Sequence, residues 1–299
     1  MPDAVPPPSE IGAHTAGSRA GGQLAVRTAS GLVLAAIALA VAYFGGWAFV
    51  AFWGGAAVLV FLEWTGLVAG SHSRISLLPG GLSVALAAGL AGAMGNSAAG
   101  VHPMRLVLAL VVLAVGTLAA AALARHKNPV TAAVGVLYAG ALALAPIVLR
   151  SDVEAGFLAV VFLFAVVWVT DIVAYLVGRA VGGPKLAPAI SPNKTWSGAI
   201  GGTAAAVAVA TTIGLAANLV GVGRIATLAA GLSAAGQIGD LFESALKRRF
   251  GVKDSGHLIP GHGGLMDRLD AFVAAAVLAA VIGVGRGGLD APGRGLLSW

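Results

Sequence analysis

The chain has 299 residues, of which 58% are hydrophobic and only 10% are charged, and its mean hydropathy is +0.93. Soluble domains carry about 25% charged residues, so this composition excludes an ordinary water-soluble protein and indicates an integral membrane protein. There is no cysteine, which excludes a disulfide framework, a thiol nucleophile and a thiolate metal site. The net charge of +6 suits anionic lipids or phosphorylated ligands, but equally the basic cytoplasmic loops of any membrane protein.

Residues 1–27 precede the first apolar stretch and are rich in proline, glycine and serine. They hold too few large apolar side chains to form a core, so we predict a disordered cytoplasmic tail. A cleaved signal peptide is not expected, because the first apolar run follows a long polar stretch and further spans come after it.

Nine apolar stretches, each near the length of about 20 residues that a transmembrane helix needs, follow within residues 28–285. Only two glycines separate the first two apolar stretches, so the boundary between these stretches is uncertain. The many glycines and alanines elsewhere favour close helix packing. We predict an all-α, polytopic membrane bundle of about nine helices in one domain, followed by a short C-terminal tail at 286–299. The predicted spans are 28–44, 47–67, 76–96, 104–124, 130–149, 155–178, 197–219, 225–246 and 267–285.

Lysine and arginine are distributed unevenly between the two sides of such a bundle. If the N-terminus is cytoplasmic, the far side receives only Arg105, Arg150, Arg224, Arg286 and Arg294, and the other thirteen of the 18 basic residues are cytoplasmic. This asymmetry follows the positive-inside rule and supports nine spans with the N-terminus inside. The alanine-rich composition and the length suggest a multi-pass protein of a bacterial inner (cytoplasmic) membrane. The two most charged loops, 179–196 and 247–266, then share the cytoplasmic face, where soluble nucleotides can reach both.

The eighth predicted span ends in a polar helical face. Its polar residues recur at steps of three or four: Gln237, Asp240, Glu243 or Ser244, and Lys247. Ionisable groups within a membrane helix usually face the bundle interior or an aqueous cavity, where they mark a site. The alternative is that Asp240 and Glu243 only pair with Lys247 and Arg248 near the membrane surface.

The ninth predicted span begins with Asp267 and Asp270, which lie three residues apart on one helical face. A Mg²⁺-assisted phosphate reaction needs oxygen ligands for a hard cation and basic groups for the remaining phosphate charge. Asp240 and Asp267, on two helix ends beside lysine and arginine, therefore predict such a site. The alternative is that Asp267 caps its helix and Asp270 is solvated, although capping and metal binding can coexist.

The loop between these spans is rich in glycine. Glycines such as Gly263 and Gly264 permit tight turns with exposed backbone N–H groups, which can hold phosphate oxygens. His257 and His262 have no thiolate and no helical partner at the spacing of a zinc site. A phosphate contact or a structural hydrogen bond is therefore expected of His262, rather than zinc binding.

The other charged loop follows Asp171, which ends the sixth predicted span. It supplies cations and neutral donors, namely Arg179, Lys185, Lys194, Ser191, Asn193 and Thr195. These residues predict a phosphate or nucleotide site. The alternative is an ordinary positive-inside loop in which Trp196 is an interfacial anchor.

With these motifs in place, the sequence resembles the phosphatidate cytidylyltransferase (CDP-diacylglycerol synthase) family. The family signature is matched by Ser244, Lys247, Arg248, Lys253, Asp254, His262, Gly263, Gly264, Asp267, Arg268 and Asp270. The segments "QIGDLFES" and "SPNKTW" also resemble the family, so the resemblance covers residues 167–285. Two positions depart from it: Ser197 stands where glutamate is common, and Ile172 stands where threonine often follows the aspartate.

The resemblance implies that CTP and phosphatidic acid are converted to CDP-diacylglycerol and pyrophosphate, a step of phospholipid biosynthesis, with Mg²⁺ and with a second cation left open. It implies Asp240 and Asp267 as metal ligands, with Asp171 as a third candidate and Glu243 and Asp270 nearby. The expected catalytic residues are Asp240, Lys247, Asp267 and Arg268. The expected substrate contacts are Ser191, Asn193, Lys194, Ser244, Arg248, Lys253, His262, Gly263 and Gly264. Membrane lipids are expected partners, nucleic acid is not, and a homodimer is left open.

Two other functions are the alternatives to this one. A CTP-dependent lipid-alcohol kinase would phosphorylate a hydroxyl group and release CDP rather than pyrophosphate, and the complete signature favours cytidylyl transfer. A transporter would need a solute path to both faces, whereas the ionisable residues gather at one face and no inverted repeat is evident.

Overall fold

The computed structural model describes residues 31–69, 74–93, 102–124, 128–219, 221–256 and 263–298. Seven helices in this part are long and apolar enough to cross a membrane: α2 (Gly46–Ala69), α4 (Pro103–Leu123), α5 (Pro129–Arg150), α6 (Gly156–Val181), α7 (Trp196–Ala216), α8 (Val222–Arg249) and α9 (Met266–Gly287). The other elements are the helix Gly31–Phe44, α3 (Arg74–Gly92), α10 (Pro292–Leu297) and the strands β1 (Lys185–Ala187) and β2 (Ser191–Thr195). The chain is therefore an all-α, multi-pass membrane protein, as its composition predicts.

Each of the nine predicted apolar stretches contains a helix, but two of these helices are short. The first and third stretches hold the apolar helices Gly31–Phe44 and Leu78–Gly92, whereas the other seven hold full-length candidate spans. At 1.5 Å per residue the first of these is about 21 Å long, against about 30 Å for the hydrocarbon core of a bilayer. The predicted tail at 1–27 lies outside the described residues, and the side of the N-terminus stays a prediction.

Two glycines make the turn between the helix Gly31–Phe44 and α2. Gly45 and Gly46 have φ angles of +63° and +55°, a left-handed conformation that glycine adopts at little cost. The guanidinium of Arg150 donates to the carbonyls of Ala42 and Tyr43 (2.6 and 3.2 Å), which satisfies part of the exposed carbonyl end of the first helix. The boundary that the sequence left uncertain is a sharp turn, fixed by a residue from α5.

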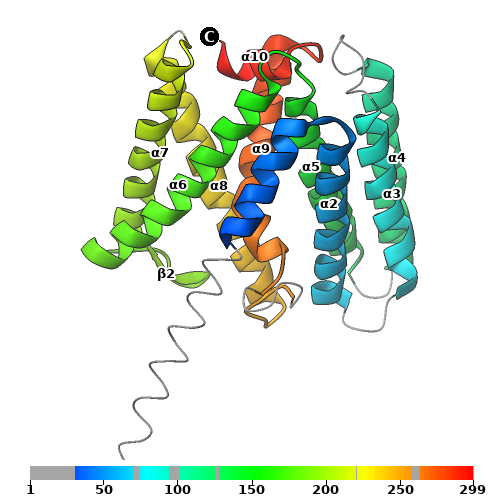
Figure 1. Cartoon of the computed structure of the whole chain (residues 1–299). Coiled ribbons are helices and arrows are strands. Elements are labelled where there is room, and N and C mark those ends of the chain that lie inside the picture. The colour runs from blue at the N-terminus through cyan, green and yellow to red at the C-terminus, as the bar shows by residue number, and fades with distance from the viewer. Residues whose placement is uncertain are drawn as a thin grey trace, which may run out of the picture.

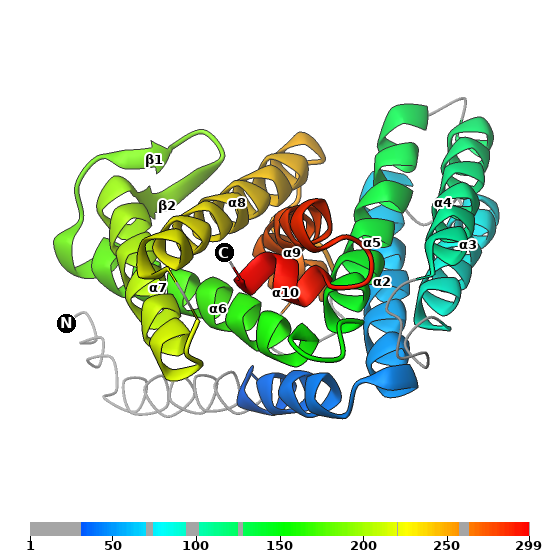
Figure 2. The ribbon, with the colours of Figure 1, turned by 90° about the horizontal axis from the view of Figure 1, so that it is seen from above.

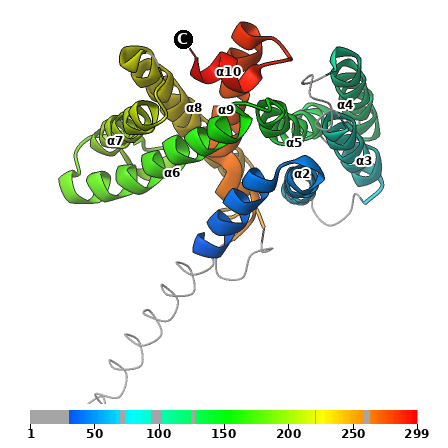
Figure 3. The same cartoon turned by 45° about the horizontal axis from the view of Figure 1, so that its top comes forward.

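The helix α9 stands at the centre of the bundle (Figure 3) and packs against α2, α5, α6, α8 and α10. The helices α3 and α4 pack together at the periphery, against α5. The hairpin, the end of α8 and the start of α9 lie at one end of the bundle, at the bottom of Figure 1, and α10 lies at the other. The loop 179–196 and the described parts of the loop 247–266 therefore share one end, as the charge distribution predicts.

The helices α6 and α7 touch backbone to backbone. The buried residues of α7 recur every four residues as a stripe: Gly198, Gly202, Ala206, Ala210 and Gly214. A Cβ added at Gly198 or Gly202 would lie 2.6 Å from the carbonyl oxygen of Ala174 or Thr170, respectively. Small residues that allow such close approach are typical of helix contacts in membranes. This contact sets the start of α7 beside the end of α6 that carries Asp171.

The segment that the sequence predicts as a loop contains an antiparallel hairpin of β1 and β2. At its end, the hydroxyl of Thr195 accepts a hydrogen bond from the N–H of Gly198 (3.1 Å) and so caps α7. The sequence did not predict strands, because segments of three and five residues, one with Pro192 inside it, show no apolar alternation. The cap fixes Asn193 and Lys194 on a strand directly before α7.

The C-terminal segment also differs from the short tail that the sequence predicts. The helix α9 continues to Gly287, and α10 lies beside it at the end of the bundle (Figure 2). Leu296 and Leu297 of α10 are buried. Glycine permits the contact between α9 and α10. A Cβ added at Gly283 would lie 2.3 Å from the carbonyl oxygen of Pro292, so a larger residue would clash with the backbone of α10. A six-residue helix with two glycines has no apolar period that a sequence could reveal.

Asp152, between α5 and α6, lies at the same end as α10 and is fully buried. It accepts hydrogen bonds from the backbone N–H and the guanidinium of Arg294 (2.8 and 3.3 Å) and from the N–H groups of Glu154 and Ala155 (3.0 and 3.3 Å). Burial alone would raise the pKa of Asp152, but these hydrogen bonds outweigh it and hold the pKa below its usual value. Asp152 therefore contributes fully to stability when the pH is above the pKa that this carboxyl group has in the unfolded chain. The contribution is lost as the pH falls through the lower pKa that the group has in the folded protein.

We expect Asp152→Asn to lower the melting temperature at neutral pH and to weaken the loss of stability below about pH 4. The measurement is thermal unfolding of the detergent-solubilised protein between about pH 7 and about pH 3. Asp290→Asn, at an exposed position just before α10, is the control. An acid transition that is the same in Asp152→Asn and in the unmodified protein would contradict this expectation.

Candidate active site

A cavity of about 500 Å³ lies between α6, the hairpin, α7 and α8. Its wall carries two carboxylates, three cations and several neutral polar groups, among them Asp171, Asp240, Arg179, Lys185, Lys194, Asn193, Thr195 and Gln237. The volume is in the range of about 300–1,000 Å³ that is usual for small-molecule sites. Among the predicted site residues, Asp171, Asn193, Lys194 and Asp240 are thus brought together around one space.

An ion pair crosses this cavity. Nζ of Lys194, on β2, contacts the carboxylate of Asp240, on α8, and each side chain is 27% exposed. The hydroxyl of Ser244, one turn further along α8, donates to the other oxygen of Asp240 (3.4 Å). Asp240 therefore pairs with a residue from the other charged loop. The alternative, in which Asp240 pairs only with Lys247 and Arg248, is wrong for this residue.

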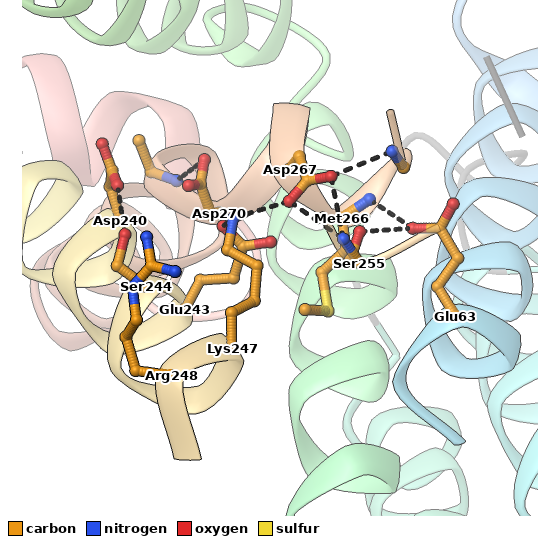
Figure 4. Close-up of polar contacts among 12 residues, drawn as sticks. Glu63, Asp240, Glu243, Ser244, Lys247, Arg248, Ser255, Met266, Asp267 and Asp270 are labelled. Carbon is orange, nitrogen blue, oxygen red and sulfur yellow. Dashed lines mark hydrogen bonds and ion pairs between the residues drawn. The ribbon is translucent and has the colours of Figure 1, made fainter. Parts of the chain in front are cut away.

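A second ionic cluster joins the end of α8 to the start of α9 (Figure 4). Nζ of Lys247 contacts the carboxylates of Glu243 (3.1 Å) and Asp267 (2.6 Å). Asp267 also accepts hydrogen bonds from the backbone N–H groups of Ser255 (3.1 Å) and Gly264 (2.9 Å). Asp267 therefore holds both ends of the intervening loop against α8.

Asp270 lies between Asp240 and Asp267 in Figure 4, in a row of carboxylates. The carboxylates of Asp171, Asp240, Glu243 and Asp270 lie close enough for their charges to interact. Oε1 of Glu243 is buried and has no hydrogen-bond partner among the described residues. The helices α6, α8 and α9 thus each bring carboxylates to one region.

Glycine allows α8 and α9 to approach closely at this level. A Cβ added at Gly239 would lie 2.6 Å from the carbonyl oxygen of Asp270, and one at Gly236 would lie 3.3 Å from that of Ala271. The residue that follows Gly239 is Asp240, so the backbone contact sets the separation of the Asp240 and Asp270 carboxylates.

Glu63, on α2, is a site residue that the sequence analysis missed. Its carboxylate accepts hydrogen bonds from the N–H groups of Leu265 (2.8 Å) and Met266 (2.7 Å) and from the hydroxyl of Ser255 (3.2 Å). These bonds, shown in part in Figure 4, satisfy N–H groups at the start of α9, where the local N-cap residue makes no side-chain bond. The signal was present, because a glutamate in an apolar span usually faces protein or a cavity.

Several predicted substrate contacts lie away from the 500 Å³ cavity. Nε of Arg248 donates to the carbonyl of Ile190 in the hairpin (3.4 Å), Ser191 begins β2, and Lys253 is exposed. None of these residues lines that cavity, and Arg268 lines a different one. Their roles toward substrate stay predictions.

The glycines before α9 shape a turn. Gly263 has a φ angle of +82°, and the N–H of Gly264 is already bonded to Asp267. His262 lies outside the described residues. Ser197, one of the two departures from the family pattern, donates to the carbonyl of Gly182 and so ties the start of α7 to the end of α6.

Within the described residues, no three carboxylate or imidazole side chains are close enough to enclose a metal ion by themselves. Magnesium, however, commonly uses only one or two protein carboxylates, together with waters and substrate phosphates. Asp171 and Asp240 line the polar cavity and offer only oxygen donors, so one or two of these carboxylates suit such a hard cation. Asp267 fits less directly, because both of its oxygens already accept hydrogen bonds.

The fold and the site define a multi-pass membrane protein with two ionic clusters at one end, beside a polar cavity suited to a phosphorylated ligand. The family model described as "Cytidylyltransferase family" matches residues 25–284, so the chain belongs to the cytidylyltransferase family.

Proteins named phosphatidate cytidylyltransferase are similar to part of this chain. One from Brucella abortus is 59% identical over 136 residues, which cover 46% of this chain and 50% of that protein. One from Staphylococcus epidermidis is 45% identical over 115 residues (38% and 44%), and one from Bacillus subtilis is 44% identical over 128 residues (42% and 48%). The chain thus spans about half the length of the curated relatives that it matches.

Proposed function

We propose that this chain transfers the cytidylyl group of CTP to phosphatidic acid at the cytoplasmic face of the inner membrane, yielding CDP-diacylglycerol and pyrophosphate. Membership of the cytidylyltransferase family supports the reaction type, and the names of the relatives support phosphatidate as the acceptor. The observation that carries the proposal is the contact of Lys194 with Asp240, which joins the basic hairpin to the signature helix across one cavity.

The chemistry needs positioning and charge neutralisation rather than a nucleophilic side chain. A phosphate oxygen of phosphatidic acid attacks the α-phosphorus of CTP, and the bond from that phosphorus to the bridging oxygen of the β-phosphate breaks. The electron pair leaves with pyrophosphate. The lipid phosphate is already ionised near neutral pH, so the obstacle is to bring two polyanions together and to stabilise the leaving group. Arg179, Lys185 and Lys194 on the cavity wall supply the cations for this task.

Mg²⁺ is the cofactor that we propose. Asp240 and Asp171 would hold it, with Asp270 and Glu243 beside them, and Asp267 would join them where Lys247 releases one of its oxygens. When bound, the ion would neutralise phosphate charge and polarise the phosphoryl oxygens. A second cation and a homodimer stay predictions.

Identification of both products tests the proposal directly. The purified full chain in detergent micelles is incubated with labelled CTP and dioleoyl phosphatidic acid, with and without Mg²⁺. We expect CDP-diacylglycerol and pyrophosphate, formed only with Mg²⁺. Release of CDP without a nucleotide-bearing lipid would contradict the proposal and indicate lipid phosphorylation. Transport cannot explain a product formed in detergent, where there are no compartments.

The contact between α8 and α9 gives a further test of the site. Gly239→Ala is expected to reduce the rate by about tenfold to a hundredfold, because the added Cβ must displace the backbone of Asp270 and with it the row of carboxylates. Gly231→Ala, on the same helix with nothing within 4 Å of the added Cβ, is the control. A folded Gly239→Ala protein with unchanged activity would show that this spacing does not matter for the reaction.

A further inference from the structure

A second cavity, of about 870 Å³, lies between the helix Gly31–Phe44, α2, α6 and α9. Its wall is apolar, with side chains such as Leu34, Leu59, Trp168, Leu269 and Phe272. Among the described residues, Arg268 in the first turn of α9 is the one charged side chain that lines it. The cavity is therefore an apolar space with a cation near the end of the bundle that carries the charged site.

The apolar cavity and the charged groups lie on different faces of α6 and α9. Asp171 lines the polar 500 Å³ cavity, whereas the next residue, Ile172, lines the apolar one. On α9, Asp267 belongs to the ionic cluster, whereas the next residue, Arg268, lines the apolar cavity. Consecutive residues of a helix point about 100° apart, so each helix presents charge to one side and the apolar space to the other.

The depth of the apolar cavity is close to that of one membrane leaflet. On α6 its lining runs from Phe164 to Ile172, which is about 12 Å along the helix. On α2 it runs from Phe52 to Leu59, which is about 10 Å. One leaflet contributes about 15 Å of hydrocarbon. The cavity therefore reaches from the level of Arg268 into the apolar part of that leaflet.

Stacked aromatic rings from three helices form part of the wall. Trp53 stacks on Phe272 with ring centroids 4.6 Å apart, and Phe164 stacks on Trp168 at 5.0 Å. Such contacts between large rings hold the wall in one shape. Trp53, Phe164, Trp168 and Phe272 all line the cavity, so these contacts give it a fixed apolar wall.

We propose that this cavity holds an acyl chain of the phosphatidic acid substrate, with Arg268 bound to the lipid phosphate at the membrane surface. The inference rests on the proposed cytidylyl transfer. An anionic lipid fits a cavity that has the cation Arg268 at its end and an apolar wall about as deep as one leaflet. The polar cavity on the other side of α6 fits the nucleotide. The two substrates thus approach the carboxylates from opposite sides of α6.

Filling the cavity tests this assignment. Gly55 lines the cavity on α2, and an added Cβ there would meet nothing within 4 Å, so Gly55→Phe places a ring in the cavity without a backbone clash. We expect KM for dioleoyl phosphatidic acid to rise about tenfold, while KM for CTP and the turnover of dihexanoyl phosphatidic acid stay unchanged. Gly89→Phe on α3, where the added Cβ also meets nothing within 4 Å, is the matched control. Equal effects of Gly55→Phe on both lipids, or the same loss in Gly89→Phe, would overturn the assignment.

A binding measurement tests the site without relying on turnover. Phosphatidic acid with a photoreactive acyl chain is expected to label α2 and α9, and Gly55→Phe is expected to reduce this labelling. Unlabelled phosphatidic acid should compete, and phosphatidylcholine should not; equal competition would mean an ordinary bilayer lipid and overturn the assignment. Labelling as expected without CDP-diacylglycerol formation would refute the proposed function alone. Full activity with labelling only elsewhere would refute the acyl-chain site alone.

Discussion

Asp240→Asn is expected to reduce the formation of CDP-diacylglycerol by about a hundredfold or more, because a preorganised charge at a reacting phosphate contributes on this scale. The substitution keeps the shape of the side chain, but it removes the charge that faces Lys194 across the cavity and a proposed ligand of Mg²⁺. The initial rate at saturating CTP and phosphatidic acid, measured over a range of Mg²⁺ concentrations, checks this result.

Asp267→Asn provides an informative comparison. We expect it to lower both activity and melting temperature, because Asp267 also holds the loop through Lys247, Ser255 and Gly264. Asp240→Asn should lower activity with little change in melting temperature. Asp290→Asn, at an exposed position near α10, is the control for both. Near-normal activity in correctly inserted Asp240→Asn and Asp267→Asn proteins would defeat the metal assignment.

Glu63→Ala is expected to have the largest effect on stability, lowering the free energy of unfolding by about 3 kcal/mol or more. The change leaves the N–H groups of Leu265 and Met266 and the hydroxyl of Ser255 without their acceptor in a buried place. Activity should fall as well, because the start of α9 positions Asp267. Thermal unfolding and initial rates of the purified protein measure the two effects.

Two variants calibrate the Glu63 result. Glu63→Gln keeps one acceptor oxygen and should lie between Glu63→Ala and the unmodified protein, since it can still cap part of α9. Leu62→Ala, at a side chain on α2 that is 42% exposed, should have little effect. If Glu63→Ala unfolds at the same temperature as Leu62→Ala, the capping role is refuted.

The local features of the site could be predicted because they are periodic along the chain. Asp240 and Lys247 lie two turns apart on α8, and Asp267 and Asp270 lie three residues apart on α9, as their spacing requires. The placement of the loop 179–196 and of the described parts of the loop 247–266 at one end followed from the distribution of lysine and arginine. A charged residue within an apolar stretch can be recognised from the sequence without knowing which residue it contacts.

The partners could not be predicted. Asp240 pairs with Lys194, 46 residues away, and Glu63 caps a helix 202 residues further along the chain. Such pairs depend on where helices cross, and the crossings are set by close contacts such as that of Gly239 with the carbonyl of Asp270. Neither hydropathy nor charge spacing records a contact of this kind.

By itself, the sequence determined that this is a multi-pass helical membrane protein with most of its basic residues on one side, because hydropathy and charge act residue by residue along the chain. Only the tertiary structure decided which charges meet, that Glu63 joins the site, and that α6 lies between a polar and an apolar cavity. The physical reason is that ion pairs and cavities form between helices, and their geometry depends on packing contacts between residues that are far apart in the sequence.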